Sequence, residues 1–222
     1  MQVVARHWSP DPVFRVLVVC TGNICRSALA ERLGRAYLDD ALGDAAEQVH
    51  LSSAGTGAVV GSGMHPDTAL VLAGFGGDHT GFVARQLAPE MVVDADLTLT
   101  LTRAHRGTAL AEAPRALART FTLREAADLL ALVDPDVDLP GDAFADRARA
   151  LVRQMAAVRA RRAGGAADDI GDPIGQPIDV QQQVGDAVVA ALVPILARLV
   201  DLHGGGRWVA GPSGTGAFVQ VS

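Results

Sequence analysis

The sequence predicts an α/β domain in which a small parallel sheet carries helices on both faces. Short apolar, β-branched runs, typical of buried strands, alternate along the chain with longer amphipathic segments, typical of helices. A glycine-containing loop joins the first run directly to the first helix. The chain has 222 residues, enough for one domain with a sizeable core. Its composition, 49% hydrophobic and 20% charged, excludes a wholly disordered, collagen-like or coiled-coil protein.

The first half of the chain contains two strands and two helices. Residues 13–19 are apolar and rich in valine, which predicts a buried strand, and leucines at helical spacing predict a helix from Ser27 to about Asp40. Val49–Ser53 is the second predicted strand. A glycine-rich loop follows it and leads to a helix over Pro66–Ala73, because proline suits the first turn of a helix.

The alternation continues in the second half. Two further strand and helix pairs are predicted at residues 96–102, 103–111, 118–122 and 123–132. Thr122 begins the last of these helices as its cap, with Glu125 three residues on. An acidic loop over 134–142 precedes an amphipathic helix over 143–162, and a second loop leads to a closing helix over 180–202, kinked at Pro194.

These elements predict a three-layer, Rossmann-like domain with about four strands over residues 13–202. The proline-rich residues 1–12 are interpreted as an extension, and the Gly/Ser-rich residues 203–222 as a flexible tail. Ligands of open parallel sheets bind at the carboxyl ends of the strands. The loop after the first strand is therefore the first place to look for a site.

Charge and cysteine content exclude several classes of protein. The 19 basic and 25 acidic residues give a net charge of −6, which argues against binding to nucleic acid or to an acidic membrane. Two cysteines exclude a disulfide-stapled secreted domain. Charged residues interrupt the most apolar stretch, 184–200, and the N-terminus lacks the apolar core of a signal peptide, so a cytoplasmic protein is expected. The six histidines show no ligand spacing, so no metal site is expected.

The loop after the first strand contains the chemistry. Residues 20–27, hereafter the nucleophile loop, have the sequence CTGNICRS and lie between the predicted strand and helix. Gly22 and Asn23 tolerate left-handed backbone, which lets a loop curl so that its N–H groups form a nest for an anion. The positive end of the following helix adds to the attraction. This arrangement suits a phosphate group.

Three side chains of the nucleophile loop fit phosphoryl transfer. Arg26 can hold two phosphate oxygens in a planar fork. The same positive field favours the thiolate of Cys20 and so makes it a nucleophile, and the hydroxyl of Ser27 can hydrogen-bond that sulfur. The alternative interpretation is that the two cysteines are simply small apolar residues buried at the end of a strand. A Walker nucleotide-binding loop is excluded, because the chain contains no lysine.

At this point the chain resembles the low-molecular-weight protein tyrosine phosphatases. Val19–Ser27 fits their signature V-C-x-G-N-x-C-R-S, and further landmarks are Ser53-Ala54-Gly55-Thr56, Ala84-Arg85-Gln86-Leu87, the strand at Asp96-Leu97 and a late Asp-Pro pair. The resemblance covers roughly residues 14–200, with insertions in the last third. It implies a small parallel sheet, a phosphocysteine intermediate and neither metal nor cofactor. It also implies that the remaining loop residues, Thr21, Ile24 and Cys25, help to bind phosphate.

Cleavage of a phosphate ester also needs a proton for the leaving oxygen, which the nucleophile loop does not supply. The family uses the aspartate of an Asp-Pro pair that precedes the last helix. Asp172 fits this order, since Pro173, Ile174 and Gly175 follow it, whereas Asp134 lies in an acidic run typical of a turn. Asp172 is therefore the predicted general acid and Asp134 the alternative.

Further residues are assigned supporting roles. Ser53 is a candidate partner for the Asn23 side chain, or a strand-end hydroxyl that bonds its own backbone. The resemblance implies that Cys25 can close a protective disulfide with Cys20. Val59 and Ile174 stand where the family usually has aromatic residues beside the substrate ring, so the predicted pocket is apolar but without ring stacking.

The sequence thus predicts an enzyme that hydrolyses phosphotyrosine in proteins. Its expected partners are a phosphorylated protein and a cognate tyrosine kinase, and it is expected to be a monomer or weak dimer. Three alternatives remain open: a thiol-dependent arsenate reductase, for which relay cysteines are lacking, a phosphoarginine phosphatase, against which Ile24 argues, and a catalytically weak phosphoprotein-binding module. The arginines of residues 143–162 are interpreted as a solvated face, with docking of acidic segments as the alternative.

Overall fold

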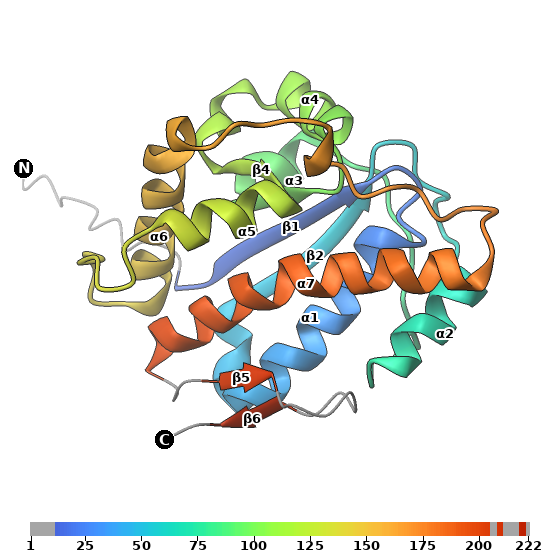
Figure 1. Ribbon diagram of the computed structural model, residues 1–222, viewed down its shortest axis with the longest axis horizontal. Helices are drawn as coiled ribbons and strands as arrows, with labels where there is room; N and C mark the ends of the chain where they lie inside the picture. Colours follow the sequence, from blue (N-terminus) through green and yellow to red (C-terminus); the bar gives the residue numbers. More distant parts are fainter. Residues whose placement is uncertain (1–11, 205–207, 211–217, 221–222) are drawn as a thin grey trace, which may run out of the picture.

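The computed structural model describes residues 12–204, 208–210 and 218–220 (Figure 1). Within them lies a four-stranded parallel sheet in the order β2-β1-β3-β4. Its strands are β1 (Phe14–Cys20), β2 (Val49–Gly55), β3 (Leu97–Thr100) and β4 (Thr120–Thr122). The α-helices are α1 (Arg26–Leu42), α2 (Pro66–Gly74), α3 (Pro89–Asp94), α4 (Arg103–Glu112), α5 (Leu123–Leu132), α6 (Phe144–Val158) and α7 (Ile178–His203). Short 3-10 turns are η1 (Gly43–Gln48), η2 (Pro114–Arg119), η3 (Arg159–Arg161) and η4 (Ala166–Asp168).

Helices cover both faces of the sheet. Alternate side chains of β1 point to opposite faces, as in any strand. Val16 and Val18 belong to the larger core, which α1, α2, α5, α6 and α7 complete, whereas Leu17 and Val19 pack with α3, α4 and η2. All four side chains are almost completely buried. The predicted three-layer α/β fold is confirmed.

The order of strands and helices matches the sequence prediction, and the differences have local causes. The fourth strand begins at Thr120 instead of Ala118, because η2 occupies the residues before it. Helix α3 is absent from the sequence prediction, because six residues with one buried side chain, Val92, are too few for a helical pattern to emerge. Pro194 lies inside α7, which continues past it to His203.

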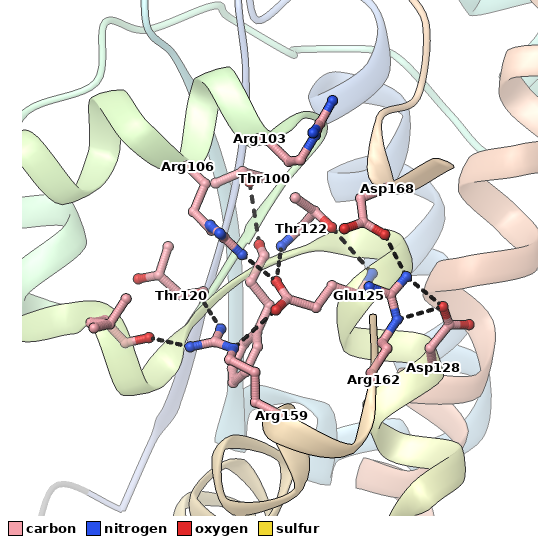
Figure 2. Close-up of polar contacts among 12 residues, drawn as sticks. Thr100, Arg103, Arg106, Thr120, Thr122, Glu125, Asp128, Arg159, Arg162 and Asp168 are labelled. Carbon is pink, nitrogen blue, oxygen red and sulfur yellow. Dashed lines mark hydrogen bonds and ion pairs between the residues drawn. The ribbon is translucent and has the colours of Figure 1, made fainter. Parts of the chain in front are cut away.

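The predicted cap of α5 is present in full. Thr122 accepts a hydrogen bond from the amide of Glu125 (3.2 Å), and the Glu125 carboxylate accepts one from the amide of Thr122 (3.1 Å). The same carboxylate is bonded by Arg106 of α4 (2.7 Å) and Arg159 of η3 (2.9 Å), as Figure 2 shows. One buried carboxylate therefore joins the segments around β4.

The interpretation of the arginines in 143–162 as a solvated face is wrong for several of them. Arg159 stacks over the Phe121 ring (4.3 Å) in addition to its bond to Glu125. Arg149 pairs with Asp96 (2.8 Å). The side chains of Arg147 and Arg162 are also bonded within the fold, whereas Arg153 and Arg161 are exposed. Arginine serves here because its several donors can bridge carboxylates and backbone carbonyls at once.

The C-terminal part of the fold bears on two predictions, the lack of a membrane-spanning segment and the flexible tail. Helix α7 is long and apolar enough to cross a membrane by length and composition, and in the structure it packs against α1, α2 and α5. Of the tail predicted to be flexible, 203–222, His203 ends α7, Gly204 is its C-cap, and the strands β5 (Trp208–Ala210) and β6 (Phe218–Gln220) pair antiparallel. The other tail residues lie outside the described ones. Most of the predicted extension, 1–12, also lies outside them.

We expect Glu125→Ala to lower the free energy of unfolding by about 2 kcal/mol, because it removes the capping bond and leaves two partly buried arginines without their carboxylate. Denaturant titration followed by circular dichroism measures the change. Glu112→Ala, at an exposed position of α4, is the control. Equal stability of the two variants would contradict the central role of Glu125.

Candidate active site

The nucleophile loop lies at the carboxyl end of β1 and is held through its carbonyl groups. The carbonyl oxygens of Cys20, Thr21, Gly22 and Ile24 accept hydrogen bonds of 2.8–3.0 Å from amides of the segment 56–65. The N-cap of α1 is Cys25, whose side chain makes no capping bond. Among the described residues, the amides of Gly22, Ile24 and Arg26 have no protein acceptor. The loop thus leaves N–H groups available to an anion at a helix N-terminus.

The bend of the loop depends on Asn23. This is the one non-glycine residue with positive φ (54°) among those described, whereas Gly22 is not left-handed, so the expectation of left-handed backbone holds for Asn23 alone. The Asn23 side chain is fully buried and donates to the hydroxyls of Ser27 (2.9 Å) and Ser53 (2.7 Å). Its carbonyl accepts from the amide of Arg85 (2.9 Å). These bonds fix a conformation that only a few residue types tolerate.

Gly55 allows the segment after β2 to approach the nucleophile loop. A Cβ atom at this position would lie 2.3 Å from the carbonyl oxygen of Thr21 and 3.0 Å from the amide nitrogen of Asn23. Both neighbours are backbone atoms and cannot rotate away. The glycine is therefore needed because two backbones come into contact, and not because of its own dihedral angles.

Of the two cysteines, Cys20 has the surroundings of a nucleophile. Its sulfur lies 2.9 Å from the Ser27 hydroxyl and 3.3 Å from the amide nitrogen of Asn23. Cys25 is buried, and this burial raises the pKa of its thiol to about 11, so that it remains a thiol at neutral pH. Both cysteines are free in the structure, and the predicted disulfide between them stays a prediction.

Arg26 of the nucleophile loop contacts Asp172, which comes from a distant part of the sequence. The guanidinium of Arg26 is 4% exposed and bonds the Asp172 carboxylate (2.6 Å) and the carbonyl oxygen of Ile170 (2.9 Å). Its Nε is buried without a hydrogen-bond partner among the described residues. An uncompensated buried donor is costly, and an oxyanion would satisfy it. The Asp172 side chain is half exposed, open to a substrate.

The alternative acid, Asp134, lies elsewhere in an exposed loop. Its carboxylate accepts a hydrogen bond from the amide of Asp136 (3.0 Å), the pattern of an Asx turn. The structure therefore brings Asp172, and not Asp134, to the nucleophile loop.

A second layer of polar residues supports the loop. Ser53 bridges Asn23 and Glu31, donating to the Glu31 carboxylate (2.6 Å), so its role as a partner of Asn23 is seen in the structure. Arg85 pairs with Glu31 (3.4 Å) and donates to the carbonyl oxygen of Ser53 (2.7 Å). Arg85 belongs to one of the sequence landmarks, whereas Glu31 carries no such signal, because its place on α1 opposite Ser53 emerges only in the fold.

His105 of α4 is another site residue that the sequence analysis missed. Its Nε2 lies 2.8 Å from the hydroxyl of Thr21, and its Nδ1 lies 2.9 Å from that of Thr102, the N-cap of α4. Burial, with the nearby Arg26 guanidinium, lowers the pKa of His105 to about 4. The imidazole is therefore neutral at physiological pH and holds Thr21 by a hydrogen bond.

The model of the family "Low molecular weight phosphotyrosine protein phosphatase" matches residues 15–158. The chain belongs to this family. A low-molecular-weight protein-tyrosine-phosphatase of Streptomyces coelicolor is 40% identical over 146 residues, which cover 60% of this chain and 80% of that protein. Wzb of Escherichia coli K12, also a low-molecular-weight protein-tyrosine-phosphatase, is 39% identical over 90 residues, which cover 40% of this chain and 56% of Wzb.

Solved structures agree with this assignment. The YwlE arginine phosphatase of Geobacillus stearothermophilus superposes with a TM-score of 0.59 at 26% identity, covering 84% of this chain and 92% of that one. The tyrosine phosphatase AmsI of Erwinia amylovora gives 0.57 at 23% identity, over 82% and 90% of the two chains, and supports the fold. The resemblance that the signature indicated is confirmed, and the family consists of cysteine-dependent hydrolases.

The two residues predicted to form walls of this phosphatase's substrate pocket lie beside the site: Val59 contacts the nucleophile loop, and Ile174 contacts Asp172. Val59 donates its amide to the carbonyl of Gly22 (3.0 Å), and the amide of Ile174 bonds the Asp172 carboxylate (3.2 Å). Both side chains are about half exposed, so each is available to a substrate. The described residues contain no group of three or more His, Cys, Asp or Glu side chains arranged to hold a metal.

We expect Gly55→Ala to lower kcat/KM for an aryl phosphate about 100-fold, because the new methyl group displaces the backbone of the nucleophile loop. Gly57→Ala is a matched control, since a Cβ there meets no atom within 4 Å. Similar activity of the two variants in steady-state assays would show that the close approach is dispensable.

We expect the buried neutral His105 to make stability fall in mild acid. Its pKa of about 4 in the folded protein lies below the ordinary value, so the unfolded state takes up a proton first as pH falls from about 6.5 toward 4. This lowers the free energy of unfolding by about 2 kcal/mol between pH 7 and pH 5. Urea titrations of the wild type and of His105→Gln measure it. Because glutamine does not titrate in this range, the free energy of unfolding of the variant should fall by about 2 kcal/mol less between pH 7 and pH 5. Equal falls in the wild type and the variant would contradict the assignment of a buried neutral His105.

Proposed function

We propose that the protein hydrolyses phosphotyrosine in proteins through a phosphocysteine intermediate. The observation that carries the proposal is the placement of the Cys20 sulfur between the Ser27 hydroxyl and the Asn23 amide, in a loop whose arginine contacts Asp172. Nucleophile, anion-binding groups and acid thus come from two segments, 20–27 and 169–174, that are far apart in sequence. The names of the relatives support phosphotyrosine as the target.

In the first step the Cys20 thiolate attacks phosphorus, forming an S–P bond while the bond from phosphorus to the tyrosyl oxygen breaks. Arg26 Nε and the loop amides donate to the equatorial oxygens, where negative charge is spread. Asp172 gives its proton to the leaving oxygen. Its contact with Arg26 places the carboxyl group at the edge of the anion site.

In the second step water attacks the phosphocysteine and Asp172, now a carboxylate, takes the water proton. The S–P bond breaks, the thiolate of Cys20 returns and inorganic phosphate leaves. The Ser27 hydroxyl, 2.9 Å from the sulfur, stabilises the departing thiolate by a hydrogen bond. No metal or cofactor is required by these steps.

Phosphoarginine is the second candidate substrate, because the arginine phosphatase YwlE shares the fold at 26% identity. Family members that act on phosphoarginine tend to have a small threonine at the place of Ile24, so this branched apolar residue favours the tyrosine substrate. A cognate tyrosine kinase, a cytoplasmic location and a monomeric or weakly dimeric state complete the proposal.

We expect Cys20→Ser to abolish hydrolysis of 4-nitrophenyl phosphate and of a phosphotyrosine peptide, and Asp172→Asn to slow the peptide reaction about 100-fold or more. Cys25→Ser is the comparison variant and should retain far more activity than Cys20→Ser, since burial raises the pKa of the Cys25 thiol to about 11 and keeps it protonated at neutral pH. Phosphate release measures all three.

Turnover by Cys20→Ser would overturn the mechanism. A phosphoarginine peptide assayed beside the phosphotyrosine peptide identifies the substrate, and faster release from phosphoarginine would favour the second candidate. Tight peptide binding with no release by the wild type would leave only a binding module.

A further inference from the structure

The first turn of α4 contacts both loops of the active site. His105 bonds Thr21 of the nucleophile loop (2.8 Å). Two residues earlier, Arg103 bonds Asp169, which precedes Asp172 by three positions. One rigid turn of helix therefore touches the loop that carries the nucleophile and the segment that carries the acid.

The contact between Arg103 and Asp169 involves both backbone and side chain. One oxygen of Asp169 accepts from the amide nitrogen of Arg103 (2.7 Å), and the other from the terminal guanidinium nitrogen (3.0 Å). The next residue, Ile170, is buried and donates its amide to the carbonyl of Leu101 (2.8 Å). Two consecutive residues of the segment 169–172, hereafter the acid segment, are thus tied to the end of β3 and the start of α4.

The arginines around this contact form ion pairs within the fold and do not make a second anion-binding site. Arg103, Arg106, Arg159 and Arg162 line one pocket (Figure 2). Each is already paired with a carboxylate: Arg103 with Asp169, Arg106 and Arg159 with Glu125, and Arg162 with both Asp128 and Asp168. Their charges offset one another, so the cluster offers little net attraction for a phosphate.

We propose that Asp169 and Arg103 are positioning residues that aim the carboxyl group of Asp172 at the leaving oxygen. The proposal rests on the proposed function, because it concerns the proton that Asp172 delivers there. Neither residue touches the phosphoryl group. Each acts through the segment 169–172, whose position relative to Cys20 is set by the first turn of α4.

Such a tether fixes the backbone of the segment, in addition to the contact between the Asp172 carboxylate and Arg26. Asp172 is half exposed, and the exposed Gly171 immediately before it gives the chain freedom at that point. Proton transfer requires the carboxyl oxygen within about 3 Å of the leaving oxygen. A displacement of about 1 Å is enough to cost about 100-fold in rate. Loss of the anchor at Asp169 should therefore impair proton delivery while the nucleophile loop stays intact.

The test measures how strongly kcat/KM depends on the leaving group. Aryl phosphates whose phenols range from acidic (4-nitrophenol) to weakly acidic (phenol, 4-methylphenol) are hydrolysed by the wild type, Asp169→Ala, Asp169→Asn and Arg103→Ala. An acidic phenol departs without help, whereas a weakly acidic one needs the proton of Asp172. Asp172→Asn gives the dependence expected when the acid is absent.

We expect Asp169→Ala to lower kcat/KM for phenyl phosphate about tenfold more than for 4-nitrophenyl phosphate, in the direction of Asp172→Asn. Asp169→Asn keeps an acceptor for the Arg103 amide and should restore part of the loss, and Arg103→Ala, which keeps that amide, should show a smaller effect than Asp169→Ala. Asp39→Ala removes a comparable Arg–Asp pair on α1 and should leave the dependence unchanged.

Equal losses on all substrates in Asp169→Ala would overturn the proposal, because a merely structural role lowers every rate together. The same series separates this outcome from failure of the proposed function. If Cys20→Ser is inactive and Asp172→Asn shows the steep dependence while Asp169→Ala does not, only the positioning role fails. If Cys20→Ser turns over, the proposed function fails as well.

Discussion

Backbone hydrogen bonds between the nucleophile loop and the segment after β2 determine what this site can do. Because four carbonyl groups of the loop are engaged from outside, the loop is held curled and its amides stay available to an anion. Gly55 permits the approach that these bonds require, and Asn23 supplies the left-handed residue at the bend. Arg26, Cys20 and Ser27 take effect only on a backbone shaped in this way, since anion binding here relies on fixed dipoles as much as on charge.

The loop and the fold were predictable because their signals are local. A valine-rich run followed by CTGNICRS predicts a strand, a bend and a helix start without knowledge of the rest of the chain. The cap formed by Thr122 and Glu125 was predictable for the same reason, being a pattern of four residues. The choice of Asp172 over Asp134 relied on family order, and the structure provides the contact with Arg26 that the sequence does not contain.

What the sequence did not reveal depends on contacts between distant residues. Glu31 and Ser53 meet because α1 packs beside β2, and His105 meets Thr21 because the carboxyl ends of β1 and β3 are neighbours in the sheet. Single polar residues of this kind have no periodicity that would mark them. The sequence pattern of the arginines of η3 and its surroundings likewise indicates solvated side chains, because their carboxylate partners lie on other elements.

The carboxylate of Glu125 has a consequence for how the protein opens. It is shared by α4, α5 and η3, so each of these segments loses a hydrogen bond of Glu125 when it separates from the others. Local unfolding of one should therefore carry the others with it, and their amides should exchange hydrogen with solvent as one cooperative unit. The first turn of α4, which holds Asp169, should then open together with α5 and η3.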